Sequence, residues 1–280
     1  MKRIAFISSL ALLFTIAAAG QYDAPPANAK PAQPAPSGAA QTSSQDPSVK
    51  KARDLIDKMI QALGGQAYLN IQDMEQSGRT YGFSHGEPAG AGALYWSFWK
   101  WPDKERIELT KQRDVVTIFN GDNGYDVTFR GTTWAEKPLV EDYLRRRHYS
   151  VQKVLRDWLK EPGVAYFYEG FSSAERKPAE KVTIMNAKNE AVTFYIDTTS
   201  FLPIKKSFLW RDPTYGDKTQ EDEVYDNYRL VQGIMTPFSV TRKKNDWATN
   251  QRFIFEVKYN QNLSDSMFDA KVGQANPKRK

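Results

Sequence analysis

Residues that commonly do chemistry are sparse in this chain of 280 amino acids. It contains no cysteine and only two histidines, which stand far apart in the sequence. His85 lies in a segment with the composition of a loop, and His148 follows three arginines. A thiol nucleophile is therefore excluded, and two isolated histidines do not form the ligand pair of a metal site. We expect no metal site and no cofactor.

Other motifs with oxygen ligands or nucleophiles have simpler explanations. Asp122 and Asn123 lack the ligand spacing and closing glutamate of a calcium loop, so a hairpin turn is expected there. The acidic run 221–223 is expected to be the solvated start of a strand. No serine stands in a nucleophile elbow, and no glycine-rich phosphate loop precedes a helix. Carboxylates paired across strands stay open, but the pattern favours a binding protein over an enzyme.

The N-terminus has the pattern of an export signal. Lys2 and Arg3 precede an apolar run to Ala19, and small residues follow. We expect a signal peptide over residues 1–20, cleaved near Ala19 or Gly20. An uncleaved anchor is the alternative, although the apolar run is shorter than the roughly 20 residues that span a bilayer. The protein is then expected in the periplasm.

Two further segments are expected to lie outside the folded domain. Residues 21–46 are rich in Pro, Ala, Gln and Ser and predict a disordered linker, and residues 271–280 form a basic tail. The formal net charge of +6 is a mild excess with mixed signs, which favours solubility and not nucleic-acid binding. We expect a monomer with at most peripheral membrane contact.

Residues 47–270 carry helix signals in two places and strand signals elsewhere. Asp46 and Pro47 predict a helix start, and Gly64-Gly65 its end. Seven apolar residues recur at spacings of three and four along this helix: Val49, Ala52, Leu55, Ile56, Met59, Ile60 and Leu63. A second amphipathic segment, residues 138–160, is inserted between strands and could break at Ser150. Strands that follow one another in this number must curl into a barrel or half-barrel to cover their apolar face.

A half-barrel with a helical lid predicts an apolar cavity. In the aromatic strand 92–101, Leu94, Trp96 and Phe98 share one face, and Tyr95, Trp99 and Trp101 share the other. We assign the first face to the cavity, with the second as the alternative. The expected lining is Leu94, Trp96, Phe98, Ile107, Leu109, Phe119, Leu155 and Trp158, with Lys100 as a head-group contact. The arginine run 145–147 is expected to face solvent, with acidic head groups as the alternative.

Several phrases, in their order along residues 47–270, resemble the outer-membrane lipoprotein-sorting (LolA/LolB-like) superfamily. They are residues 62–65 (ALGG), 101–103 (WPD), 119–125 (FNGDNGY), 197–203 (DTTSFLP), 226–237 (DNYRLVQGIMTP) and 259–260 (YN) leading to Phe268. The resemblance implies a mainly β fold with two helical segments: an unclosed antiparallel barrel of about eleven strands, an N-terminal helix and an inserted helical lid. In the family an arginine before the proline of the second strand ties the lid shut, whereas Trp101 stands at that place here.

The resemblance also implies a function. It predicts a periplasmic carrier or chaperone that holds a lipoprotein acyl chain, or another amphiphile, for transport toward the outer membrane. The alternative is an envelope sensor or scaffold that uses the same barrel to bind a protein partner.

Overall fold

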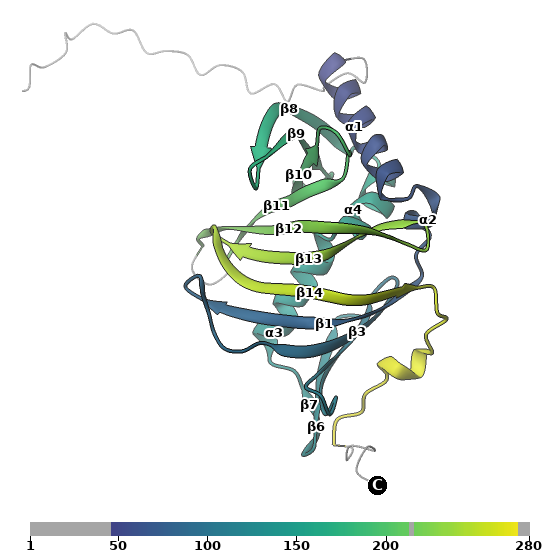
Figure 1. Ribbon diagram of the computed structural model, residues 1–280, viewed down its shortest axis with the longest axis vertical. Helices are drawn as coiled ribbons and strands as arrows, with labels where there is room; N and C mark the ends of the chain where they lie inside the picture. The colour runs from purple at the N-terminus through teal and green to yellow at the C-terminus, as the bar shows by residue number, and fades with distance from the viewer. Residues whose placement is uncertain (1–45, 213–215, 274–280) are drawn as a thin grey trace, which may run out of the picture. The chain divides into compact units, whose positions relative to one another are not determined.

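The computed structural model describes residues 46–212 and 216–273. Within them, fourteen strands join one antiparallel sheet that does not close (Figure 1). Its order is β7-β6-β5-β4-β3-β1-β14-β13-β12-β11-β10-β9-β8, and β2 pairs only with β1. The strands are β1 (Asp73–Ser84), β2 (Glu87–Pro88), β3 (Ala93–Lys100), β4 (Lys104–Leu109), β5 (Val115–Asn120), β6 (Asn123–Thr128), β7 (Gly131–Trp134), β8 (Ala165–Ala174), β9 (Lys177–Met185), β10 (Ala191–Asp197), β11 (Pro203–Arg211), β12 (Lys218–Val231), β13 (Ile234–Lys244) and β14 (Trp247–Tyr259).

The expected fold class is confirmed, with more strands than the family resemblance implied. Almost every strand pairs with its neighbour in sequence, which hairpin turns permit. The exceptions both involve β1. It pairs with β3 beyond the short β2, and it pairs with β14, which brings the two ends of the domain together. The expected signal peptide, nearly all of the linker and most of the tail lie outside the described residues, so their boundaries stay predictions.

Helices cover one face of the sheet, which we call the inner face. They are α1 (Pro47–Leu63), α2 (Gln66–Leu69), α3 (Lys137–His148), α4 (Val151–Arg156) and the 3-10 turn η1 (Trp158–Lys160). A second 3-10 turn, η2 (Asp265–Phe268), lies on the opposite, outer face against β4 and β5. Figure 1 shows α3 and α4 behind the central strands and α1 beside β8 and β9. Within the described residues, no helix is long and apolar enough to cross a membrane.

The first helix forms as its sequence predicts. The Asp46 carboxylate accepts a hydrogen bond from the Ser48 amide at 2.8 Å, and the chain turns out of the helix at Gly64. All seven residues of the apolar stripe are buried against the sheet. The main core therefore lies between α1, α4 and the inner face of β8–β14.

The inserted segment is two helices joined at Ser150. The Ser150 hydroxyl caps α4 by accepting a hydrogen bond from the Lys153 amide at 3.2 Å. The expected break is confirmed. At its other end, Arg156 donates to the Ile71 carbonyl at 2.6 Å and lies 3.7 Å from the centre of the Trp101 ring. The helical segment is thus fastened by its own arginine stacked on Trp101, where the family pattern has an arginine in the strand.

A tight backbone contact fixes the β1–β14 pairing. The register shifts between Ser77 and Gly78, so Phe255 is an extra residue on β14. A Cβ atom at Gly78 would lie 2.2 Å from the Phe253 carbonyl oxygen, closer than any side chain tolerates. Only glycine fits this position without a backbone shift.

We expect Gly78→Ala to destabilise the protein by about 1–3 kcal/mol, because the added methyl forces β1 away from β14. Gly82→Ala, on the same strand, is the matched control, since a Cβ there meets no described atom within 4 Å. Urea unfolding of both variants measures the difference. Equal midpoints for the two would contradict the tight contact.

Candidate functional site

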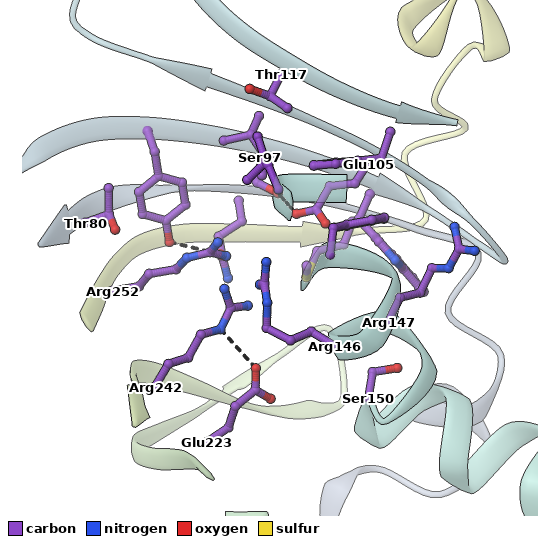
Figure 2. Close-up of a pocket in the computed structure, with 18 of the residues that line it drawn as sticks. Thr80, Ser97, Glu105, Thr117, Arg146, Arg147, Ser150, Glu223, Arg242 and Arg252 are labelled. Carbon is purple, nitrogen blue, oxygen red and sulfur yellow. Dashed lines mark hydrogen bonds and ion pairs between the residues drawn. The ribbon is translucent and has the colours of Figure 1, made fainter. Parts of the chain in front are cut away.

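A cavity of about 410 Å³ lies between α3 and the inner face of β1, β3, β4, β5, β12, β13 and β14 (Figure 2). Two smaller cavities, of about 320 and 200 Å³, adjoin it and share its lining residues Glu223, Arg242 and Arg252. The inner face is therefore hollow where β12–β14 pass beneath the lid.

One wall of the large cavity is apolar. Trp99 of β3, Ile107 and Leu109 of β4, and Phe119 of β5 all project into it. Tyr143 of α3 closes this wall by stacking on Phe119, with ring centres 3.7 Å apart and planes within 6°. Burial raises the pKa of Tyr143 well above its usual range, so the phenol stays neutral. This wall suits a hydrocarbon.

The opposite wall is cationic. Figure 2 shows the guanidinium groups of Arg146, Arg242 and Arg252 directed toward one another. Arg146 comes from α3 and pairs with Asp142 at 2.7 Å, whereas Arg242 of β13 pairs with Glu223 at 3.0 Å. Among the described residues, no carboxylate lies within 4.0 Å of Arg252, whose guanidinium lies 5.4 Å from the centre of the Tyr95 ring.

The pKa values of the three arginines reflect their burial and their closeness to one another. Burial and the neighbouring Arg242 lower the pKa of Arg252 to about 10, and the same two causes lower the pKa of Arg146. Burial also opposes the charge of Arg242, but the carboxylates of Glu223, Glu105 and Asp142 together outweigh it, and the pKa of Arg242 is raised. All three arginines are charged at neutral pH.

A row of alternating charges crosses three neighbouring strands and ends at Arg242 of the cationic wall. Lys206 of β11, Glu223 of β12 and Arg242 of β13 are direct partners in the strand register. The Lys206 Nζ lies 2.9 Å from Glu223 Oε2, as an ion pair without an aligned hydrogen bond. Lys206 is completely buried. Burial alone would raise the pKa of Glu223, but Lys206 and Arg242 hold it well below its usual range.

Part of the cavity lining was predicted from the sequence. Ile107, Leu109 and Phe119 line it as expected. Leu94, Trp96 and Phe98 do not, because the inward face of β3 carries Tyr95, Ser97 and Trp99. The face assigned to β3 is therefore wrong by one residue. Phe98 instead packs on the outer face against Val116, Ile118, Leu263 and Phe268.

The other two expected lining residues and the expected head-group contact also lie elsewhere. Leu155 and Trp158 are buried in the main core and are not at the mouth of the cavity. The Lys100 ammonium donates to the Leu263 carbonyl at 2.8 Å and pairs with Asp265 at 3.0 Å, on the outer face. Lys100 is thus held by the segment around η2 and does not reach the cavity.

The cationic wall was not predicted from the sequence. Residues 221–223 are not a solvated strand start, since Glu221 and Asp222 are buried and Glu223 faces the cavity. The arginine run 145–147 is not free in solvent either, because Arg145 pairs with Glu221 at 2.8 Å and Arg147 with Asp122 at 2.9 Å. A weak signal was present for Arg252, which precedes Phe253 and Ile254 in a strand pattern, but not for Arg242, which stands between Thr241 and Lys243.

Comparison with known proteins rests on structure. No family model matches the sequence, and no curated protein matches it. A DUF1329 family protein from Desulfovibrio piger superposes with a TM-score of 0.55 and 12% identity, over 79% of this chain and 97% of that one. A domain assigned to outer-membrane lipoprotein sorting, from Vibrio parahaemolyticus, gives 0.50 and 8% identity over 79% and 97% of the chains. The chain shares the fold of this lipoprotein-sorting domain.

A LolA superfamily protein from Nitrosomonas europaea is also similar, with a TM-score of 0.47 and 13% identity over 78% of this chain and 97% of that one. At these identities the likeness concerns the fold alone. The site must therefore be interpreted from its own residues. Among the described residues, no group of three or more His, Asp or Glu side chains could hold a metal ion.

Proposed function

We propose that the protein is an exported carrier or chaperone that holds an acyl chain, or another amphiphile, beneath its helical lid, for transport toward the outer membrane. The observation that carries this proposal is the apolar wall formed by Trp99, Ile107, Leu109 and Phe119 inside the lidded cavity. Removal of hydrocarbon from water drives binding, at about 25 cal/mol per Å² before ordering costs are subtracted. Release follows lid opening and requires no covalent chemistry.

The lid in this proposal is the segment α3–α4–η1. Its contacts with the cavity wall include the Tyr143–Phe119 stack and the pairing of Arg147 with Asp122 in the β5–β6 turn. The Arg147 guanidinium also donates to the Gly121 and Asp103 carbonyls. The Asp122 side chain is mostly exposed to solvent, so its ion pair with Arg147 contributes little stability. Movement of α3 away from β5 would open the apolar wall while α4 stays fastened by Arg156.

We expect Trp99→Ala to weaken the uptake of a fluorescent fatty acid by at least about tenfold, because it removes the largest apolar side chain of the wall. Trp96→Ala is the matched control, since Trp96 lies three residues away on the same strand but faces outward. Fluorescence titration of both variants, with thermal melting to verify folding, measures the effect. If Trp96→Ala alone weakens uptake, the ligand binds elsewhere.

A second candidate is an envelope sensor or scaffold that binds a protein partner. The observation in its favour is the outer face of β14, where Phe253 and Phe255 remain 42% and 59% exposed. Native mass spectrometry of the protein purified from its envelope separates the two candidates. Co-purified lipid favours the carrier, whereas an empty cavity with a bound protein favours the scaffold.

A further inference from the structure

The three arginines stand where the cavities meet. Arg242 and Arg252 line all three cavities, and Arg146 lines two of them. Of the three, only the cavity of about 410 Å³ has the apolar wall of Ile107, Leu109 and Phe119. A molecule lying along that wall would therefore have one end beside the guanidinium groups.

The charges at this point are not fully matched. Glu223 is shared between Lys206 and Arg242, and Asp142 is shared between Arg146 and Arg145. Glu105 also lines the cavity, where it accepts a hydrogen bond from Ser97 at 2.9 Å. Among the described residues, the Arg252 guanidinium has no carboxylate within 4.0 Å and no hydrogen-bond partner, although its backbone is paired within the sheet.

Guanidinium groups that face one another repel in a sheltered site. Burial, and then this repulsion, lower the pKa values of Arg146 and Arg252. An anion placed among them would relieve the repulsion and accept paired hydrogen bonds from their forked donors. Carboxylate and phosphate groups both have that geometry.

We propose that Arg252, with Arg146 and Arg242, binds the anionic head group of an amphiphile whose hydrocarbon tail lies against Ile107, Leu109 and Phe119. This inference rests on the proposed function and names its ligand class. The head group is a carboxylate or a phosphate, as in a fatty acid or an acidic phospholipid. A purely neutral lipid would leave Arg252 without a counter-charge.

Three probes of one chain length test the inference: decanoate, decyl phosphate and decanol. They are titrated calorimetrically into the mature protein at about pH 8, where the carboxylate is ionised and Arg252 keeps its charge. We expect at least one anionic probe to bind about tenfold or more tightly than decanol. The tighter of the two anionic probes identifies the head group as carboxylate or phosphate.

Arg252→Gln should remove most of that preference and leave decanol binding unchanged. Arg229→Gln is the matched control, because Arg229 is an exposed strand arginine that lies over Phe238 outside the cavity. It should behave like the unaltered protein. The preference of the unaltered protein should also fall as salt is added, whereas decanol binding should not change.

The outcomes separate this inference from the function on which it rests. Equal binding of decanol and both anions overturns the head-group inference and leaves the carrier proposal standing. Loss of decanol binding together with the anions in Arg252→Gln makes Arg252 a structural residue and also overturns it. Absence of binding by every probe to the unaltered protein overturns both proposals.

Discussion

Replacement of Trp158 by alanine should destabilise the protein by about 3–5 kcal/mol, the cost of removing a fully buried aromatic side chain. Only 1% of its surface is exposed. Its ring packs edge-on against Tyr149 at 5.7 Å, and Tyr149 in turn stacks on Phe208 of β11 at 4.3 Å. This chain of rings joins the end of the helical segment to the inner face of the sheet, so its loss should loosen both.

The measurement is urea unfolding followed by far-ultraviolet circular dichroism. Trp247→Ala is the matched control, because Trp247 at the start of β14 is 61% exposed and little burial is lost there. We expect a change below about 1 kcal/mol for that variant. If Trp158→Ala costs no more than Trp247→Ala, the helical segment is an appendage and the lid assignment fails.

Sequence predicted the first helix well because its signals are local. The cap at Asp46, the stop at Gly64 and the apolar stripe between them all operate within a few residues. The break at Ser150 was predictable for the same reason. Such signals need no knowledge of which strand lies next to which.

The face of β3 could not be predicted from its own sequence. Both faces of this strand are rich in aromatic residues because both are covered, one by the cavity lid and the other by the segment around η2. Alternation indicates which residues share a face, but not which face is inner. Phe98 packs against a cluster that includes Leu263 and Phe268, which lie more than 160 residues away in the sequence, and no local pattern indicates this.

A bulge makes the faces of β14 impossible to assign by simple alternation. Simple alternation places Phe253, Phe255, Val257 and Tyr259 on one face. The extra residue Phe255 reverses the alternation, so Phe253 and Phe255 are exposed while Ile254, Val257 and Tyr259 are buried. The same strand carries Arg252 into the cavity, so an undetected bulge hid part of the cationic wall.

The largest electrostatic effect should come from Glu223→Gln. Its carboxylate lies between Lys206 and Arg242 in three neighbouring strands, and Tyr225 donates a further hydrogen bond to it at 2.8 Å. Without its charge, the completely buried Lys206 ammonium loses its counter-ion. Breaking a buried pair in this way costs about 3–5 kcal/mol.

Two comparisons isolate the cause. Glu256→Gln removes an exposed strand carboxylate paired with Lys258 at 3.0 Å, and should cost below about 1 kcal/mol. Lys206→Met combined with Glu223→Gln also removes the Lys206 ammonium that Glu223→Gln alone leaves without a counter-ion. The double variant should therefore be more stable than the sum of the two single changes predicts. A strictly additive result would show that the ion pair does not couple the two strands.

The effect should also depend on pH in a defined direction. The pKa of Glu223 is lower in the folded protein than in the unfolded chain, so the unfolded chain binds more protons across that interval. The stabilisation by Glu223 is therefore complete above the unfolded carboxyl value of about 4.3 and is lost as pH falls through the folded value. The free-energy gap between the unaltered protein and Glu223→Gln should be constant from neutral pH to about 5 and shrink in stronger acid. Unfolding free energies of both proteins, measured at successive pH values, test this expectation. A gap that widens on acidification would mean that Glu223 is protonated in the folded protein. Its proximity to Lys206 and Arg242 would then not be an ion pair.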